Sequence, residues 1–178
     1  MRLFFAVLLP DAVRAALGRL QTASADYRWV DPSSMHITLA FLGEQPEDRL
    51  SELQRIGAEA ARSPGGTLRL GQAGQFGSKR APRVLWVDIT GDAESLLALQ
   101  RRLTNGLRTG GFPVEEREFR AHITLARRRE TARGGAPEGW PPAVEHASFA
   151  MRELTLMQSR LSPRGPTYTP VFEFQLRG

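Results

Sequence analysis

The chain has 178 residues and a formal net charge of +5, with 41% hydrophobic and 24% charged residues. These values are typical of one soluble globular domain, or of two small lobes that share a core. The absence of cysteine excludes disulfide bonds and thiolate metal sites, and three histidines without metal-binding spacing favour chemistry without a metal or other cofactor.

The positive charge comes almost entirely from arginine, because Lys79 is the only lysine. Arginine pairs bidentately with phosphate oxygens, which favours a phosphate-bearing partner such as RNA. A GC-rich genome would enrich arginine in the same way, and composition leaves both interpretations open. The opening apolar run from Leu3 to Leu9 is too short for a signal core or a membrane span, so we expect a cytoplasmic protein without membrane contact.

In chain order, the hydrophobic pattern predicts strands that alternate with helices. A buried strand is predicted at 2–8, a helix at 11–23 and a short extended segment at 27–30. A turn at 31–34 leads into a strand at 35–42, which is followed by a helix at 46–61. Strands at 67–75 and 83–89 flank a loop at 76–82, and a third helix covers 92–108. The remaining strands are predicted at 119–126, 144–149, 151–159 and 168–176, with a Gly- and Pro-rich loop at 131–142.

Strands and helices are interspersed, and hairpin-like neighbours indicate antiparallel pairing, so the predicted class is α+β. An internal repeat, described next, indicates two similar lobes, each an antiparallel sheet backed by helices. We expect residues 1–178 to form a single two-lobed domain with a central groove, and we expect a monomer.

The run His-Ile-Thr-Leu-Ala occurs twice, beginning at His36 and at His122. Because side chains alternate along a strand, Ile37, Leu39 and Phe41 are expected on one buried face of the first copy. Each histidine would share the opposite face with the threonine two residues later. The sequence therefore predicts two strands that each present a histidine beside a hydroxyl.

A single histidine of this kind is usually a half-buried imidazole that is satisfied by a backbone carbonyl. Two copies point to chemistry, because packing gives no reason to repeat a histidine and a threonine on the less apolar face. Two imidazoles across a groove can act as general acid and general base near neutral pH. Threonine hydroxyls and an arginine can hold the oxygens of an anion between them. This set suits in-line displacement at phosphorus.

These motifs resemble those of the two-histidine phosphoesterases, whose mark is a pair of His-x-Thr-x sequences. Within that superfamily the chain looks like the bacterial and archaeal RNA 2′,3′-cyclic phosphodiesterases, historically called 2′-5′ RNA ligases. The resemblance covers essentially the whole chain. The residues that carry it are 36–39 and 122–125, the opening Arg2 to Val7, the segment Pro82 to Trp86, Arg127, and the closing Ser159 to Leu161 and Gly165 to Tyr168.

The resemblance implies a bilobal fold and metal-independent hydrolysis of RNA 2′,3′-cyclic phosphate ends, or of small cyclic nucleotides, to 2′-phosphomonoesters. It implies that His36 is the proton donor to the 3′ oxygen and that His122 is the proton acceptor that activates water. Thr38, Thr124 and Arg127 would bind the phosphate. The alternatives are 2′-5′ RNA ligation by the reverse reaction and a non-catalytic protein that binds RNA ends.

Several other residues near the motifs have more than one interpretation. Arg127 would face away from His122 on an ideal strand, and a bulge or twist at the strand end would return it to the groove. Phe41 takes the place of that arginine in the first motif, where it either distinguishes the two sides of the substrate or belongs to the core. Tyr168 and Phe41 are candidates for stacking on a base. Trp86 is expected in the core, and His146 is expected in a structural or surface role.

Overall fold

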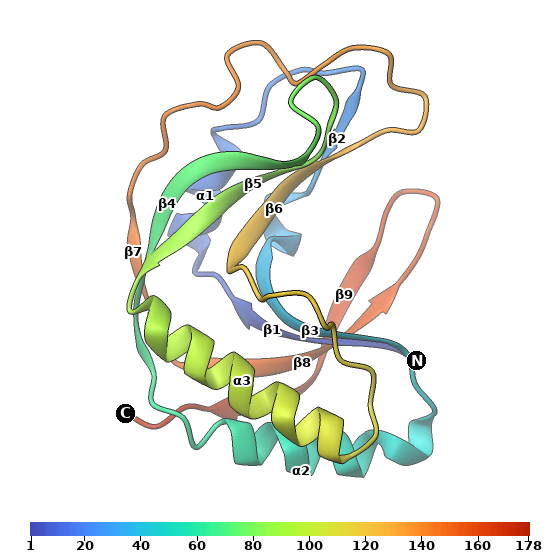
Figure 1. Ribbon diagram of the computed structural model, residues 1–178, viewed down its shortest axis with the longest axis vertical. Helices are drawn as coiled ribbons and strands as arrows, with labels where there is room; N and C mark the ends of the chain where they lie inside the picture. Colours follow the sequence, from blue (N-terminus) through green and yellow to red (C-terminus); the bar gives the residue numbers. More distant parts are fainter.

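Antiparallel strands that curl into a half-barrel dominate the computed structural model, which describes residues 1–178 (Figure 1). Eight strands follow the order β7-β4-β5-β6-β3-β1-β8-β9, and β2 pairs with β6 outside this path. The strands are β1 Arg2–Leu8, β2 Tyr27–Trp29, β3 His36–Glu44, β4 Gly66–Gly77, β5 Pro82–Gly91, β6 His122–Arg128, β7 Ser148–Met151, β8 Glu153–Arg160 and β9 Thr167–Gln175. The helices are α1 Asp11–Gly18, α2 Leu50–Ala60 and α3 Ala93–Thr109, with 3₁₀ turns at η1 Pro32–Ser34 and η2 Glu47–Arg49. This α+β architecture confirms the predicted class.

The sheet has two halves that meet between β3 and β6. One half has the order β7-β4-β5-β6 and the other the order β3-β1-β8-β9. Each half contains a strand, a helix and the motif strand in this order along the chain, as β1-α1-β3, with β2 and η1 between α1 and β3, and as β5-α3-β6. The two lobes predicted from the repeat are therefore halves of one continuous sheet, with the motif strands side by side at its centre.

The main core lies between the sheet and the helices. It contains 31 buried residues from both halves, among them Ile37, Ile123 and the inward-facing leucines of α3. Figure 1 shows α2 and α3 side by side across one end of the molecule, where α2 contacts β8 and β9 and α3 contacts β3 and β4. The helical spacing of Leu96, Leu99 and Leu103 explains this packing, because those side chains form one apolar stripe.

Several predicted element boundaries are wrong. The strand predicted at 119–126 begins only at His122, and the helix predicted at 46–61 begins as the η2 turn, with α2 starting at Leu50. The first helix ends at Gly18, because the amides of Leu20 and Gln21 close tighter turns onto residues 17 and 18. Phe76 and Gly77 belong to β4, since they pair with β5 and leave only a short turn at 78–81. The segment 144–147 forms no strand and β7 begins at Ser148. A strand ends where its partner strand no longer pairs with it. Residue propensity does not reveal that position.

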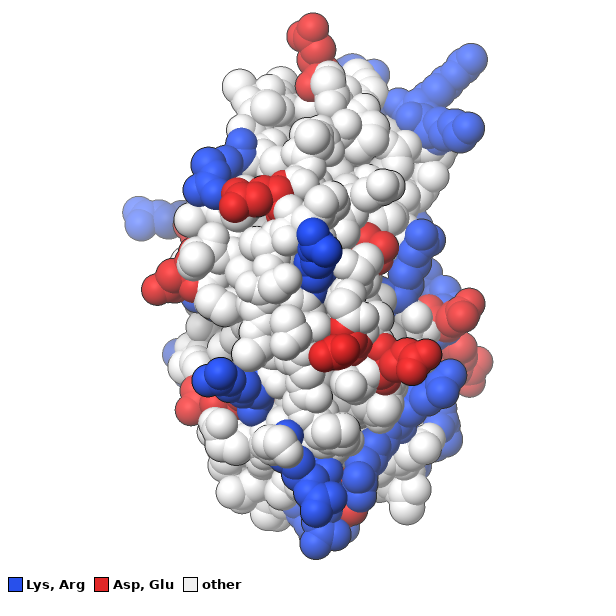
Figure 2. Space-filling model, turned by 90° about the vertical axis from the view of Figure 1, so that its left-hand side faces the viewer, with Lys and Arg blue, Asp and Glu red and all other residues white.

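None of the helices combines the length and the apolar character needed to cross a membrane. On the side of the molecule that carries β4 and β7, basic and acidic side chains are scattered among uncharged ones, and basic side chains gather at the lower end of the view (Figure 2). The excess of positive charge is therefore not spread as one uniform patch over this side.

Candidate active site

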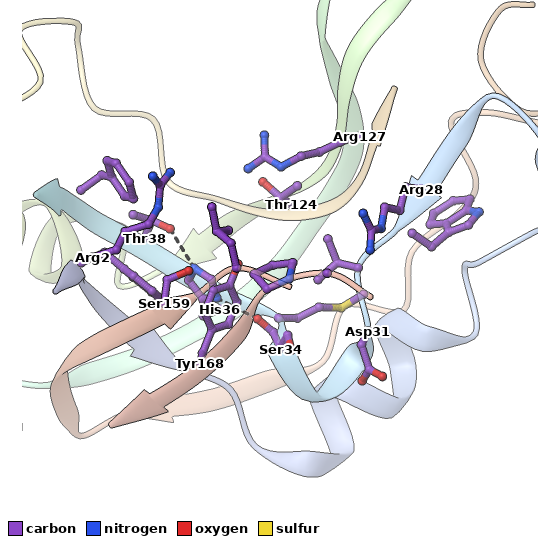
Figure 3. A pocket seen from close by; sticks show the side chains of 18 of the residues that line it. Arg2, Arg28, Asp31, Ser34, His36, Thr38, Thr124, Arg127, Ser159 and Tyr168 are labelled. Atoms are coloured by element: carbon purple, nitrogen blue, oxygen red, sulfur yellow. Dashed lines mark hydrogen bonds between the residues drawn. The ribbon is translucent and has the colours of Figure 1, made fainter. Parts of the chain in front are cut away.

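The two motif strands are neighbours at the centre of the sheet. β3 and β6 run antiparallel and pair at Ile37 and Ile123, so an approximate twofold axis passes between these two residues. Both isoleucines are fully buried. The motif histidines and threonines lie on the other face and line a cleft of about 620 Å³. In Figure 3, the side chains of His36 and Thr38 lie across this cleft from those of Thr124 and Arg127.

Each motif strand contains a β-bulge at the same place in the repeat. The register of β3 on β1 skips Leu39, and the register of β6 on β5 skips Leu125. A bulge residue reverses the alternation of the side chains that follow it. Both leucines and the alanines that follow them are accordingly buried. The residue three positions after each threonine therefore turns back to the face that carries the histidine.

The bulges decide the position of Arg127 and of Phe41. Arg127 lines the cleft together with His122 and Thr124, as expected for a bulged strand end. Phe41 also lines the cleft and is 49% exposed. The expectation that Phe41 shares a buried face with Ile37 and Leu39 is therefore wrong, because that expectation assumed unbroken alternation along β3.

Both motif histidines are oriented by their own strand. The Nδ1–H of His36 donates to the carbonyl oxygen of Ser34 at 2.8 Å, and that of His122 donates to the carbonyl oxygen of Arg120 at 2.7 Å. A carbonyl can only accept, so each neutral ring carries its proton on Nδ1 and its lone pair on Nε2. The Nε2 of His36 lies 2.9 Å from the Thr38 hydroxyl, which donates to it.

The surroundings favour the neutral form of both rings. Burial lowers the pKa of His36 below its ordinary value of 6.5, and the positive charges of Arg127 and Arg14 lower it further. Burial also lowers the pKa of His122, with Arg127 and Arg120 adding to the effect. The hydrogen bonds from Nδ1 to the two carbonyls act in the opposite direction and are outweighed.

An aromatic ring stands edge-on to each imidazole. The ring of Tyr168 contacts His36 with centroids 5.3 Å apart, and the ring of Phe76 contacts His122 with centroids 5.0 Å apart. Burial raises the pKa of the Tyr168 hydroxyl, which lines the cleft in its neutral form. The structure thus places Tyr168 and Phe41, the two residues predicted to stack on a base, at the cleft.

The cleft is strongly cationic compared with the rest of the surface. Its charged lining consists of four arginines and one carboxylate: Arg2, Arg28, Arg127, Arg164 and Asp31. The Arg2 guanidinium lies over the Phe41 ring at 4.8 Å from the centroid. β1 therefore supplies a cation beside the position where the first motif carries phenylalanine instead of arginine. Such a lining attracts phosphate.

Two successive matches to one family model show the family to which this chain belongs. Residues 7–86 and residues 87–168 each match the family model described as LigT like Phosphoesterase. The chain belongs to the LigT-like phosphoesterase family. The two successive matches agree with the internal duplication, since each contains one of the two motif strands, β3 and β6.

Several relatives of this LigT-like phosphoesterase are similar over nearly their full length. An RNA 2′,3′-cyclic phosphodiesterase of Thermus thermophilus is 38% identical over 100% of this chain and 91% of its own length. The crystal structure of TT0787 from Thermus thermophilus superposes with a TM-score of 0.85 at 33% identity, covering 100% of this chain and 99% of that one. Escherichia coli LigT complexed with 3′-AMP has a TM-score of 0.82 at 31% identity and covers 98% and 97% of the two chains.

Sequence reasoning missed several residues that line the cleft of this LigT-like phosphoesterase. Arg2, Arg28 and Arg164 are far apart in the sequence and are brought to the motifs by β1, β2 and the turn between β8 and β9. Arg2 belongs to the opening segment that carries the family resemblance, whereas the only signal for Arg28 and Arg164 was the preference for arginine, which composition alone could not localise.

Two further expectations concern residues outside the repeats. Trp86 is buried at 7% exposure, as expected for the core. The His146 Nδ1 donates to the carbonyl oxygen of Leu70 at 2.9 Å, and this residue does not line the cleft. Both therefore have the structural roles that the sequence predicted.

Proposed function

We propose that this protein hydrolyses RNA 2′,3′-cyclic phosphate ends to 2′-phosphomonoester ends, with residues 1–178 acting as one two-lobed domain. The observation that carries the proposal is the pair of His-Thr sets on β3 and β6, which lie on either side of an approximate twofold axis and line one cationic cleft. The names of the relatives, RNA 2′,3′-cyclic phosphodiesterases, support the same substrate class.

In the proposed reaction, the His122 Nε2 takes a proton from water, and the water oxygen forms a bond to phosphorus. The bond between phosphorus and the 3′ oxygen breaks, and the Nε2–H of His36 protonates that oxygen. The assignment of donor and acceptor follows the family resemblance. Each ring's Nδ1 is held by a carbonyl, which leaves Nε2 to exchange the proton. The product keeps its phosphate on the 2′ oxygen.

The non-bridging oxygens would be held by Thr38, Thr124 and Arg127. Hydroxyl and guanidinium donors fixed around a developing negative charge stabilise the transition state without a metal. No group of three or more His, Asp or Glu side chains in this protein is placed to hold a metal ion. We propose a metal-independent mechanism on this donor set, and full activity in the presence of a chelator is its test.

The substrate itself would set the protonation of the acid. Both histidines have a lowered pKa, so the free protein holds both rings neutral at pH 7. A bound phosphodiester brings a negative charge that raises both pKa values again. His36 then takes up the proton that it later donates, while His122 remains available as the base.

Replacement of either histidine tests the proposal. We expect His36→Ala and His122→Ala each to lower kcat for adenosine 2′,3′-cyclic phosphate by at least roughly 10²-fold, because each removes a general acid or base. The matched control is His146→Ala, which removes a histidine outside the cleft and should retain wild-type turnover. Near-normal turnover by both motif variants would contradict the mechanism.

Product analysis separates hydrolysis from its alternatives. Incubation with RNA halves that end in a 2′,3′-cyclic phosphate and a 5′-hydroxyl should give mainly the 2′-phosphate, because water is far more abundant than the second RNA end. A dominant 2′-5′ linked product would favour ligation. Binding without any loss of the cyclic phosphate would favour a protein that only binds RNA ends.

A further inference from the structure

A second cleft of about 600 Å³ adjoins the candidate active site. His36, Tyr168 and residues 164–166 of the turn between β8 and β9 line both clefts. His122, Thr124 and Arg127 line only the first cleft. The two cavities therefore meet at His36 and Tyr168, on the side of the proposed proton donor.

The second cleft has the lining of an anion site. Its polar and charged side chains, apart from those of His36, Ser34 and Tyr168, are Arg14, Asp31, Ser33, Ser162, Arg164 and Thr167. Two guanidinium groups and three hydroxyls thus surround a space within the usual size range of ligand pockets. Residues from α1, from η1 and from the hairpin of β8 and β9 contribute to it.

Arg14 is the more buried of the two arginines in this lining, and it has unused hydrogen-bonding capacity. Its Nε is buried and has no hydrogen-bond partner. Its one ion pair, with Asp11, is long at 3.7 Å, and the Asp11 side chain is fully exposed to solvent. A guanidinium group that is mostly buried and so weakly paired favours the binding of an anion, to which it donates in a planar fork.

The single carboxylate of the second cleft is already engaged. Asp31 accepts a hydrogen bond from the backbone amide of Ser33 at 2.8 Å and another from the Ser33 hydroxyl at 2.6 Å. These bonds cap the η1 turn and lower the pKa of Asp31. Asp31 therefore has a local structural partner, and it does not neutralise Arg14.

The direction of the proposed reaction indicates which anion belongs here. If His36 protonates the departing 3′ oxygen, then the ribose of the terminal nucleotide lies on the His36 side of the phosphorus. RNA continues from that ribose through its 5′ phosphate, one sugar away from the cyclic phosphate. The second cleft is lined by His36 and not by His122, so it lies on the side where we expect the 5′ phosphate of the terminal nucleotide.

We propose that the second cleft binds the 5′ phosphate of the terminal nucleotide, with Arg14 as its main contact. Resting on the proposed function, this makes the protein selective for the end of an RNA chain over a free nucleoside 2′,3′-cyclic phosphate. Arg164 supplies a second guanidinium group, whereas the hydroxyls of Ser162 and Thr167 donate to the carbonyl oxygens of Gly165 and Arg160 and would have to turn to reach an anion. Tyr168 stands at the junction, beside the ribose.

The test compares two substrates that differ only at the 5′ position: adenosine 2′,3′-cyclic phosphate and its 5′-phosphorylated form. We expect wild-type kcat/KM to be higher for the 5′-phosphorylated substrate. In Arg14→Met, which keeps the length of the side chain without its charge, the ratio of the two kcat/KM values should fall about tenfold, as for a lost charged hydrogen bond. Arg14→Lys should restore part of the ratio. Arg55→Met, on the exposed surface of α2, should leave the ratio unchanged.

An equal effect of Arg14→Met on both substrates would overturn the inference, because it would show a general role in folding or in the environment of His36. A wild-type ratio of one would overturn it as well. Should Arg14→Met fail to fold, Arg14→Gln replaces it, since glutamine keeps a polar end in the same place.

A binding experiment separates this inference from the proposed function. Calorimetry with adenosine 2′-monophosphate and adenosine 2′,5′-bisphosphate needs no turnover. Tighter binding of the bisphosphate that is lost in the Arg14 variants supports the second site, even if the protein hydrolyses no cyclic phosphate. Equal binding of the two ligands overturns the second site, even if hydrolysis is fast.

Discussion

The orientation of each motif histidine is settled by a hydrogen bond to a carbonyl only two residues away. Ser34 and Arg120 supply these carbonyls in the two copies of the repeat. Because both contacts are local, the sequence that encodes the motif also encodes the direction of Nε2. The charge of each ring, in contrast, depends on burial and on arginines from other elements.

The lowered pKa values predict a loss of stability on acidification. A histidine whose folded pKa lies below its unfolded value of 6.5 contributes stability that is present above pH 6.5 and lost as pH falls toward the folded pKa. We expect the free energy of unfolding, measured with urea, to decrease as pH falls below the unfolded value of 6.5. His36→Gln should flatten this dependence. A profile unchanged by the substitution would show that His36 is not the group responsible.

Bound phosphate should raise the pKa values of His36 and His122. We expect NMR titration of the imidazole signals to give pKa values below 6.5 for His36 and His122 in the free protein. Added phosphate should raise both values, because the anion stabilises the charged rings. Unshifted motif histidines would argue against a phosphate between them.

At the scale of the elements, the bulges in β3 and β6 matter more than the strand propensities. Regular alternation would bury Arg127 and would leave an alanine in its place at the cleft. The skipped residues Leu39 and Leu125 are both buried, so hydrophobic packing stabilises the bulge in each copy. The bulge in β6 therefore brings Arg127 beside the pair His122 and Thr124, whereas the bulge in β3 brings Phe41 to the corresponding place.

If Arg127 binds the phosphate, its substitution should weaken substrate binding and catalysis. Arg127→Ala should raise KM for adenosine 2′,3′-cyclic phosphate and lower kcat, together by about 10-fold to 100-fold in kcat/KM, because a charged hydrogen bond to phosphate is lost. Arg129→Ala, an exposed arginine of the same segment that does not line the cleft, is the matched control. Equal effects of the two substitutions would mean that only net charge matters.

The contact between α2 and β9 makes Gly57 sensitive to substitution. A Cβ atom at this position would lie 2.5 Å from the ring of Phe174, which is itself buried. Alanine favours helix by about 1 kcal/mol over glycine, but overpacking of a core costs about 1–3 kcal/mol. We expect Gly57→Ala to lower the free energy of unfolding. Ser51→Ala, on the exposed side of the same helix, should be neutral or stabilising; a stabilised Gly57→Ala would show that Phe174 moves freely.

At the scale of the whole molecule, the sheet is a duplicated unit joined along its two motif strands. The two matches to the LigT-like family model, over residues 7–86 and 87–168, each contain one motif strand. Only the pair Ile37 and Ile123 links β3 to β6 in the ladder. The two halves therefore separate on either side of this pair, and the cleft lies along that separation.

The cationic cleft predicts a dependence on salt. We expect kcat/KM for a short RNA that ends in a 2′,3′-cyclic phosphate to fall as salt rises, with a logarithmic slope of about −0.7 for each phosphate contact. Arg164→Gln, which removes a cation that lines both clefts, should make this slope shallower. Arg55→Gln, on the exposed face of α2, should leave it unchanged. A slope near zero for the wild type would mean that the cleft does not bind phosphate electrostatically.

The sequence by itself determined the class of fold, the duplication and the candidate pairs His36-Thr38 and His122-Thr124, because alternation and repetition are local properties of the chain. Only the tertiary structure decided that Phe41 faces the cleft, that Arg2, Arg28 and Arg164 join the motifs, and that a second cleft adjoins His36. These features depend on strand register and on which distant strands pair. Register follows from the packing of the whole sheet, and a single segment does not encode it.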